Sequence, residues 1–468
     1  MIGLLAFLAL VLAVLGLMNY YIWRRAVRAT TRTGSRGRRI GTWLAIAAFF
    51  STAIAQMGVR LFPPDVATPL AWVGFSWLGV AFYFVLFLLV GELIRLGIRV
   101  FGAGRSTPVA ADAPRPAPVP AAAVAPLGAA ESRVAVQERP GRTNEPARPN
   151  EVRTKELDRR GEVDPANGSD GRNDADRTSG PPAADEREVN RRLFLSRSIA
   201  LGAGVAAAGV GGYGVTRALA DPVVRQIRVQ IATLDPALAG FRIALFSDAH
   251  LGSIRRKAAM EKLVDAVNGT VPDLVAVVGD LIDGSVADLG GDVAPMAGLQ
   301  SRHGTYFVTG NHEYYSGAQQ WIDYLPDLGV RVLRNERLAI ERDGAAFDLA
   351  GINDINGADF DDPPDYEQAL GGRRDDRPVV LLVHQPVDVD KAVDYGVDLQ
   401  LSGHTHGGQL WPFDVIINAQ QGAVSGLSRI EDTQLYVTAG AGFWGPPMRV
   451  GADPEVVVIE LVSRAAPD

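Results

Sequence analysis

Three long apolar stretches near the N-terminus limit most strongly what this chain of 468 residues can fold into. They cover residues 2–23, 40–62 and 70–98, and a bilayer-spanning helix needs about 20 such residues. Buried core helices are the alternative, but no polar face interrupts the stretches and nothing nearby in the chain would cover them. No charged segment precedes Leu4, which argues against a cleaved signal peptide there. The sequence therefore predicts a transmembrane region of three spans over residues 1–101.

Arginines between these stretches indicate their orientation. The segment 24–39 holds seven arginines and no acid, so it should stay in the cytoplasm. The turn at residues 63–65 carries one acid and no base, which fits the outer side of the membrane. The spans carry no charge away from their ends, which disfavours a transporter.

Residues 102–190 are rich in Pro and Ala and then in mixed charge, with few large apolar side chains. Such a segment cannot bury enough surface to offset its ordering entropy, so we predict a disordered cytoplasmic linker.

Residues 190–196 read Asn-Arg-Arg-Leu-Phe-Leu-Ser and precede a weakly hydrophobic Ala/Gly run. This pattern resembles a twin-arginine export signal, and the small residues around Leu219 match what signal peptidases accept. Residues 191–220 are therefore either a fourth span or a cleaved signal, and export machinery of the twin-arginine type is an expected partner. In both cases residues 221–468 would form an extracytoplasmic domain of a multi-pass cell-membrane protein. The alternative is a cytoplasmic domain whose Ala/Gly run is a surface helix.

The region 221–468 reads as one globular domain of the α/β class. Apolar runs bounded by turn signals predict strands at residues 243–246, 274–278, 306–308, 379–383, 399–401, 435–438 and 456–461. Helical patterns cover residues 257–267 and 319–328. Strands and helices alternate at first and strands dominate later, which favours two packed sheets with helices outside.

Polar residues follow these strands, and five of the six histidines are among them. The sets are Asp248-Ala249-His250, Gly279-Asp280, Gly310-Asn311-His312-Glu313, His384 and Gly403-His404-Thr405-His406. Strand ends with short loops converge on one edge of a sheet, where ligands of a single site can meet. A lone histidine is more often structural, and we assign that role to the sixth, His303.

Composition narrows the chemistry of such a site. The chain has no Cys, which excludes thiolate ligands, cysteine nucleophiles and disulfides. The formal net charge of −7 argues against nucleic-acid binding through bulk electrostatics. Imidazole, carboxylate and amide ligands suit Mn, Fe or Zn better than Ca or Mg.

The ordered set of five motifs over residues 241–461 resembles the calcineurin-like metallophosphoesterase superfamily. Residues 407–410 and 445–449 resemble its membrane-associated or exported bacterial branch. The resemblance implies a four-layer α-β-β-α sandwich and a phosphoester hydrolase with two divalent transition metal ions. By resemblance, Asp248, His250 and His406 would hold one metal, Asn311, His384 and His404 the other, and Asp280 both. His312 would donate a hydrogen bond or proton near the leaving group, and Glu313 would fix its orientation.

Elementary chemistry supports this assignment independently. Two divalent ions about 3.5–4 Å apart can clamp the attacking and leaving oxygens of a phosphoryl transfer, and a bridging carboxylate lets them approach. Two such ions bring four positive charges; Asp248, Asp280 and one hydroxide remove three and leave an excess that attracts phosphate. An amide ligand such as Asn311 preserves that excess, which a carboxylate would cancel.

The leading hypothesis is therefore hydrolysis of a phosphodiester, lipid-linked or of the cell envelope because of the predicted membrane setting. A phosphomonoesterase or nucleotide phosphodiesterase for soluble substrates and a non-catalytic metal-bound scaffold are the alternatives. Trp411-Pro412-Phe413 could line a pocket, although a packed aromatic turn is the plainer interpretation. Arg449 could contact phosphate or be an ordinary surface or ion-paired arginine.

Overall fold

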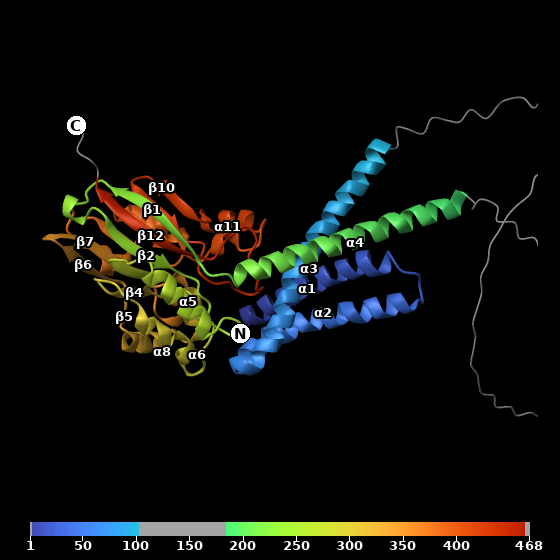
Figure 1. The fold of residues 1–468 in the computed structure, drawn as a ribbon, viewed down its shortest axis with the longest axis horizontal. Helices are drawn as coiled ribbons and strands as arrows, with labels where there is room; N and C mark the ends of the chain where they lie inside the picture. Colours follow the sequence, from blue (N-terminus) through green and yellow to red (C-terminus); the bar gives the residue numbers. More distant parts are fainter. Residues whose placement is uncertain (1, 103–183, 464–468) are drawn as a thin grey trace, which may run out of the picture.

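The computed structural model describes residues 2–102 and 184–463, which form a helical bundle and an α/β domain (Figure 1). The predicted linker over 102–190 lies almost entirely outside the described residues. The bundle contains α1 (Ile2–Ile22), α2 (Arg36–Leu61), α3 (Pro64–Gly102) and α4 (Ala184–Ala218). Three described helices contain segments long and apolar enough to cross a membrane, at Arg36–Leu61, Pro64–Ile98 and Asn190–Ala218. The first predicted span coincides with α1, whose initial side chains are outside the description.

The ends of the bundle differ in what they contact. At the end remote from the α/β domain, Arg25 after α1 pairs with Glu92 of α3 at 3.1 Å. Nε of Arg197 on α4 donates there to the carbonyl of Thr30, in the arginine-rich turn before α2. At the other end, Asp65 at the start of α3 pairs with Arg256 of the α/β domain at 2.8 Å. The arginine-rich turn and the α/β domain thus lie at opposite ends of the bundle.

The α/β domain contains two six-stranded sheets, each with a parallel centre. The first sheet has the order β1 (Val223–Ile231), β12 (Glu455–Ser463), β2 (Phe241–Phe246), β3 (Leu274–Val278), β4 (Thr305–Val308) and β5 (Val330–Val332). The second has the order β10 (Gly426–Ile430), β11 (Thr433–Val437), β9 (Leu399–Ser402), β8 (Val379–Leu382), β7 (Ala345–Gly351) and β6 (Glu336–Arg342). All seven strands expected from the apolar runs are present.

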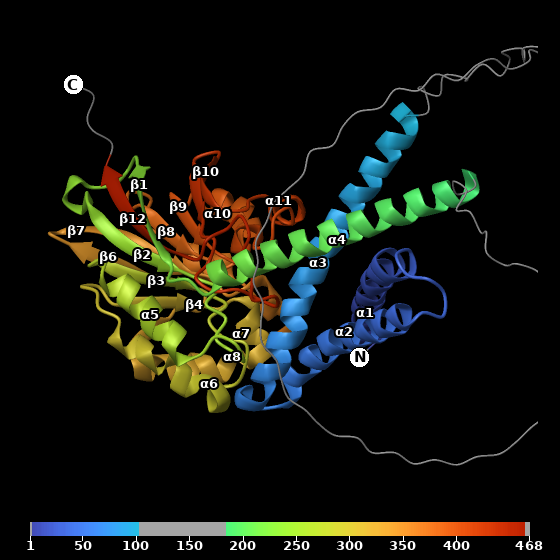
Figure 2. The ribbon, with the colours of Figure 1, turned by 45° about the vertical axis from the view of Figure 1, so that its right-hand side comes forward.

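Alternate side chains of these strands build two different cores. Ile243 and Leu245 of β2 point into the core between the sheets, where they share a cluster with Leu382 and Leu401 of the second sheet. Ala244 and Phe246 point outward and join a second cluster. The outer helices are α5 (Lys257–Asn268), α6 (Val286–Val293) and α8 (Ala318–Tyr324) on the first sheet and α9 (Tyr366–Leu370) and α10 (Val389–Asp394) on the second. The predicted α-β-β-α layering is confirmed (Figures 1 and 2).

Two short helices lie near the sheet edge that carries the polar motifs. They are α7 (Asn311–Ser316), which begins directly after β4, and α11 (Asp414–Gln421), which follows the last histidine motif. In both views α11 lies on the side of the α/β domain that faces the bundle (Figures 1 and 2). The edge with the motifs is therefore also the edge nearest the helices.

Candidate metal centre

All seven predicted metal ligands follow strands, at the carboxyl ends of the parallel centres of the two sheets. They come from β2 (Asp248, His250), β3 (Asp280), β4 (Asn311), β8 (His384) and β9 (His404, His406). Nδ1 of His384 lies 2.7 Å from the carbonyl oxygen of Val278, so the second sheet contacts the end of β3 in the first. The chain thus brings together residues that are up to 158 positions apart (406 − 248) in one buried place.

Five of these residues have a left-handed backbone. The φ angles are 54° at Asp248, 44° at His250, 53° at Asp280, 69° at His404 and 51° at His406. Residues with a Cβ atom rarely adopt this conformation, and such strain persists where the surrounding structure enforces it. The loops therefore direct these side chains inward at a conformational cost that other contacts offset.

Glycines next to the ligands allow the loops to approach one another. A Cβ atom at Gly310 would collide with the carboxylate of Asp280, and one at Gly403 would collide with Ser247 and Asp248. The backbone of each loop thus touches a side chain of another, which only glycine permits.

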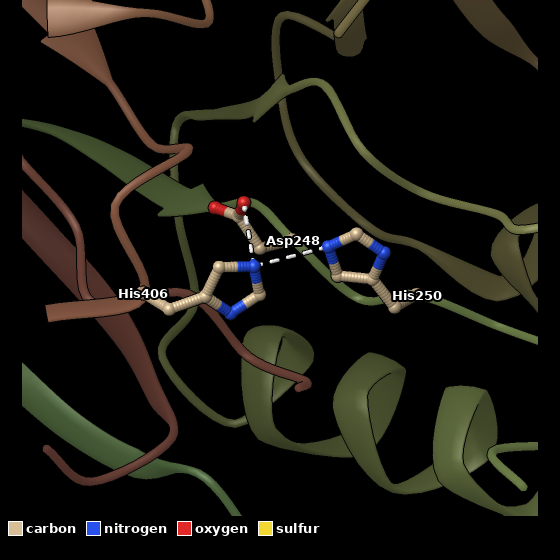
Figure 3. A group of neighbouring side chains, drawn as sticks. All are labelled: Asp248, His250 and His406. Atoms are coloured by element: carbon tan, nitrogen blue, oxygen red, sulfur yellow. Dashed lines mark hydrogen bonds and ion pairs between the residues drawn. The ribbon is translucent and has the colours of Figure 1, made fainter. Parts of the chain in front are cut away.

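Asp248, His250 and His406 form the first group of potential ligands (Figure 3). Nε2 of His250 lies 3.1 Å from Nε2 of His406, and the latter lies 3.4 Å from Oδ1 of Asp248. Nδ1 of His250 contacts a different carboxylate, that of Asp283, at 2.9 Å, so the neutral ring carries its proton there. Facing ring nitrogens and a carboxylate oxygen are the arrangement that a cation between them would satisfy.

Asp280, His384 and His404 form the second group. Nε2 of His384 lies 3.1 Å from Oδ2 of Asp280 and 3.2 Å from Nδ1 of His404. Because Nδ1 of His384 donates its proton to the Val278 carbonyl, Nε2 is the ring nitrogen that faces Asp280 and His404. Oδ2 of Asp280 is also 3.7 Å from Nε2 of His250, so this carboxylate lies between the two groups.

Asn311 provides a test of whether the residues fit metal ions. Its side-chain Oδ1 is buried without a hydrogen-bond partner, which is costly for an amide oxygen. Coordination of a cation by this Oδ1 atom would remove the free-energy cost of burying it without a partner. Together with Nε2 of His384 and the carboxylate of Asp280, this orphaned oxygen makes a set of ligand atoms that fits a divalent cation.

The partner of His312 is a residue that the sequence interpretation missed. Nδ1 of His312 lies 2.7 Å from Oδ1 of Asp283, the same oxygen that contacts His250. Asp283 follows Asp280 by three residues in the loop after β3, and that shared loop was the available signal. Asp283 therefore orients two imidazoles, one in each of two neighbouring loops.

Glu313 is expected to orient His312, and in the structure its carboxylate contacts backbone N–H groups rather than the imidazole. The Glu313 carboxylate is fully buried and accepts hydrogen bonds from the backbone N–H groups of Asp280, Leu281 and Gly310, at 2.7–2.9 Å. As the third residue of α7, Glu313 points back across the first turn of that helix toward the loop after β3. It fixes the loop that carries Asp280 and Asp283 and reaches His312 only through them.

Local charges shift the pKa values of His312 and His404, the two half-buried histidines of the centre, in opposite directions. Burial alone would lower the pKa of His312, but the carboxylates of Asp280 and Asp283 outweigh burial and raise it to about 9. Burial and then the charge of His384 lower the pKa of His404 to about 3. These surroundings favour a protonated His312 and a neutral, ligand-competent His404.

Arg449 is neither on the surface nor in an ion pair. Its side chain is fully buried, and its guanidinium donates to the carbonyl oxygens of Gly442, Ala439 and His406, among others. Such a set ties the loop after β11 to the loop that carries His406. Arg449 thus holds the loop of His406 in place, and its guanidinium is used on backbone carbonyls rather than on a phosphate.

Aromatic side chains surround the open side of the centre. The rings of Tyr315 and Trp444 each lie 5.6 Å from the ring of His312, centroid to centroid, and both are exposed. The turn at Trp411 is also exposed, which corrects the expectation of a packed turn. His303 contacts the ring of Phe241 in the core between the sheets and is not among the possible metal groups of the described residues.

Comparison with known proteins agrees with this geometry. Residues 241–408 match the family model described as calcineurin-like phosphoesterase. An uncharacterized metallophosphoesterase of Helicobacter pylori is 34% identical over 278 residues, which cover 59% of this chain and 73% of that relative. The chain belongs to the calcineurin-like phosphoesterase family. It is a metallophosphoesterase, an enzyme of metal-dependent phosphoester hydrolysis.

Two further relatives show how far the similarity extends. A Bos taurus transmembrane protein with metallophosphoesterase domain is 38% identical over 267 residues, which cover 54% of this chain. The chain spans 60% of the length of that relative. An uncharacterized metallophosphoesterase of Bacillus subtilis is 32% identical over 288 residues and is covered over 99% of its length. Membrane association is thus a feature that this metallophosphoesterase shares with a named relative.

Proposed function

We propose that this metallophosphoesterase hydrolyses phosphodiesters that are linked to lipid or belong to the cell envelope. The contact between the rim of the metal centre and the membrane helices carries this proposal. Oη of Tyr83 on α3 donates to the carbonyl of Trp411 at 2.9 Å, and the N–H of Arg449 donates to the carbonyl of Gly214 on α4 at 2.9 Å. A centre held this way reaches phosphoesters at a membrane surface without a large movement of the domain.

We assign the ligands in two sets that share one carboxylate. Asp248, His250 and His406 would hold one divalent ion, Asn311, His384 and His404 the other, and Asp280 both. When bound, the ions would neutralise charge on the phosphate group and activate a water molecule. Mn, Fe or Zn suits this mixture of imidazole, carboxylate and amide.

The charge of this ligand set favours an anionic substrate. Asp248 and Asp280 are the only carboxylates of the proposed ligand set, and the nearby acids Asp283 and Glu313 contact two imidazoles and backbone N–H groups, respectively. The two carboxylates leave the loaded centre with net positive charge, which attracts the phosphate group of a substrate.

His312 is the proposed proton donor. Because Asp283 accepts the Nδ1 proton, it stabilises the charged ring and leaves the Nε2 proton for the substrate. Donation from Nε2 to the leaving oxygen would let that oxygen depart as an alcohol. Glu313 acts as a positioning residue, because it holds the loop of Asp280 and Asp283 through backbone N–H groups.

The open rim favours a diester over a monoester. Tyr315 and Trp444 flank His312 with exposed rings, so the group on the leaving oxygen meets an apolar surface rather than a closed wall. A phosphodiester places an organic group at this rim, which a small monoester does not need.

Turnover by the full-length protein in lipid nanodiscs with added Mn²⁺ tests the proposal. The substrates are a glycerophospholipid, bis-(p-nitrophenyl) phosphate, p-nitrophenyl phosphate and a cyclic nucleotide. We expect the two acyclic diesters, the glycerophospholipid and bis-(p-nitrophenyl) phosphate, to be hydrolysed with the highest kcat/KM. A higher kcat/KM for p-nitrophenyl phosphate or for the cyclic nucleotide would contradict the proposal and indicate an enzyme for soluble substrates. No turnover by the metal-loaded protein would indicate a non-catalytic scaffold.

Two variants serve as the matched pair for this assay. His312→Ala is expected to lower kcat about 10²–10⁴-fold, the usual contribution of a positioned acid. His303→Ala removes a histidine that is remote from the centre and is expected to leave kcat near the wild-type value. Full activity of His312→Ala on every substrate would contradict the proton-donor role.

We further propose that the α/β domain lies outside the cytoplasm in a multi-pass membrane protein. The seven arginines of residues 24–39 place positive charge at the end of the bundle remote from that domain, and positive loops stay inside. The proposed regions are 1–101 (spans), 102–190 (linker), 191–220 (fourth span) and 221–468 (catalytic domain). A periplasm-dependent reporter fused after residue 468 should be active, and a fusion at residue 34 should be inactive.

Residues 190–196 are proposed to act as a twin-arginine signal that is retained as part of α4. Ala218 is buried, and Arg217 pairs with Asp453 at 2.6 Å, which ties the end of α4 to the catalytic domain. Replacing both Arg191 and Arg192 by Lys should retain the catalytic domain in the cytoplasm. Unchanged export of this variant would exclude the twin-arginine machinery as a partner.

A further inference from the structure

A charge-poor loop beside the metal centre exposes large apolar side chains. We name residues 411–417 the aromatic segment; its exposed members are Trp411, Phe413, Val415 and Ile416, which are 42–68% exposed. Between His406 and Arg429 the chain has one charged residue, Asp414, and that residue is half-buried. No side chain of α11, a helix that the structure describes throughout, is buried. An apolar group of this size on one surface marks an interaction site.

Contacts with α3 and α4 fix the position of the aromatic segment. The carbonyl of Trp411 accepts the hydrogen bond from Tyr83, and the N–H of Trp411 donates to Val450 at 2.8 Å. Met448, two residues before Val450, packs between the helices, because Cβ atoms at Gly79 and Gly211 would lie 2.5 Å and 3.5 Å from its side chain.

These helix residues belong to the candidate spans rather than to their extensions. Tyr83 and Gly79 lie within Pro64–Ile98, and Gly211 lies within Asn190–Ala218. Pro64–Ile98 is longer than the about 20 residues that cross a bilayer, and its start contacts the α/β domain through Asp65. The residues after Tyr83 are therefore proposed to cross the bilayer, which places Tyr83 and the aromatic segment near its outer surface. The exposed apolar surface also continues onto the helices, at Val73 of α3 and Tyr213 of α4.

We propose that the aromatic segment lies in the outer surface of the lipid bilayer, beside the metal centre. This inference rests on the proposed membrane placement and names lipid, not a second protein, as the occupant of the surface. Tryptophan and phenylalanine in a segment without basic or exposed acidic residues suit the interface between acyl chains and headgroups. The N–H groups of Val415, Ile416 and Ile417 donate to the carbonyl oxygens of Pro412 and Phe413, which lowers the cost of placing this turn at the interface.

The proposed position of the aromatic segment in the bilayer surface determines the route by which a lipid substrate would reach the metal centre. Nε2 of Gln409, next to the segment, donates to the carbonyl of Trp444 at 2.9 Å, and the ring of Trp444 faces His312. The aromatic segment, Trp444 and His312 thus form a continuous path from the bilayer surface to the proposed proton donor. A lipid would bring its phosphoester to the centre while its acyl chains stay in the bilayer.

The absence of Cys from the chain gives a direct test of depth. Single cysteines at Val415 and Ile416 would carry a nitroxide spin label in full-length protein reconstituted into phosphatidylcholine–phosphatidylglycerol vesicles. Collision rates with oxygen, which concentrates in lipid, and with a water-soluble nickel chelate report the depth of each label. We expect both labels to favour oxygen, at about 5–10 Å below the headgroups.

Two positions calibrate this measurement. Leu89→Cys on α3, six residues beyond Tyr83 toward the cytoplasmic end, is a lipid reference, and Val271→Cys, in an exposed turn before β3, is a water reference. Labels at 415 and 416 that match the Val271 label would overturn the proposal. Labels protected from both reagents would also overturn it, because they would reveal a protein partner or a second copy. The measurement needs no turnover, so its result is independent of the proposed reaction.

A charge-insertion variant links depth to activity. The double variant Val415→Glu, Ile416→Glu places two carboxylates where lipid is proposed. Because remote binding energy supports turnover, kcat/KM for a phospholipid in vesicles should fall at least about tenfold more than kcat/KM for bis-(p-nitrophenyl) phosphate. Equal losses on both substrates would contradict the proposed lipid contact.

Discussion

Oδ1 of Asp283 lies 2.7 Å from Nδ1 of His312, and the same oxygen lies 2.9 Å from Nδ1 of His250. One carboxylate thus sets the tautomer of the proposed proton donor and of a proposed metal ligand. Each ring then presents Nε2 to the centre, where His312 would donate and His250 would ligate. The proposed proton transfer by His312 and the proposed metal binding by His250 would therefore be coupled through this single oxygen.

Asp283→Asn should therefore damage both functions. The amide keeps the size of the side chain but cannot stabilise two imidazole N–H groups, so we expect metal affinity and kcat each to fall about 10–100-fold. Mass spectrometry of bound metal together with steady-state kinetics measures the two effects. Asp288→Asn, which alters an exposed acid near the same loop, is the control. Wild-type metal content and kcat in Asp283→Asn would contradict the coupling.

Asn311→Asp tests the need for a neutral ligand. A carboxylate would retain the ion that the buried Oδ1 of Asn311 is proposed to hold, but it would cancel positive charge that attracts phosphate. We expect normal metal content, a KM for anionic diesters raised about tenfold, and weaker inhibition by inorganic phosphate. Asn311→Ala should instead lose one of the two ions. Tighter phosphate inhibition of Asn311→Asp would show that the charge balance is wrong.

The strand-end positions of the site were predictable from local sequence. The run before Asp280 is a buried strand because its consecutive apolar residues fit the parallel centre of a covered sheet, and the strand before His404 is buried although Gln400 and Ser402 interrupt its apolar residues. Edge strands were harder. β1 reads VVRQIRVQI, in which charged and polar residues separate the Val and Ile side chains, so it lacks the continuous apolar run that predicted the central strands.

Side-chain pairing could not be predicted in the same way. Asp283 and His312 are separated by 29 residues, and their contact depends on the left-handed turn at Asp280. Arg449 is equally hidden in the sequence, since its partners are backbone carbonyls, which have no residue signature. The docking of Met448 on Gly79 needs the three-dimensional positions of two segments more than 350 residues apart (448 − 79 = 369).

That docking predicts an effect of helix α3 on the metal centre. A Cβ atom at Gly79 would lie 2.5 Å from Sδ of Met448, so Gly79→Leu must displace the loop that continues into Arg449. Because Arg449 holds the loop of His406, we expect kcat to fall about 10–100-fold, as small misplacements of reacting groups do. Turnover in nanodiscs measures the change.

Gly97→Leu is the matched control for this variant. Gly97 lies on the same helix, but a Cβ atom there has no heavy atom within 4 Å. It should therefore insert, fold and turn over as the wild type does. Equal activity of the two variants would mean that the loop does not depend on α3.

Asp388 is predicted to make stability depend on pH. Burial and then the charge of Asp354 raise its pKa from 3.8 to about 6, and its Oδ2 has no hydrogen-bond partner. The native state thus binds the proton more tightly than the unfolded state, so stability is lost as pH rises from about 4 to 6. Above that range ionised Asp388 costs about 2–3 kcal/mol, at 1.36 kcal/mol per pKa unit. Asp388→Asn should remove this cost. Chemical unfolding of both proteins should show equal stability at pH 4 and a more stable variant at pH 7.5, and a difference that does not change with pH would contradict the assignment.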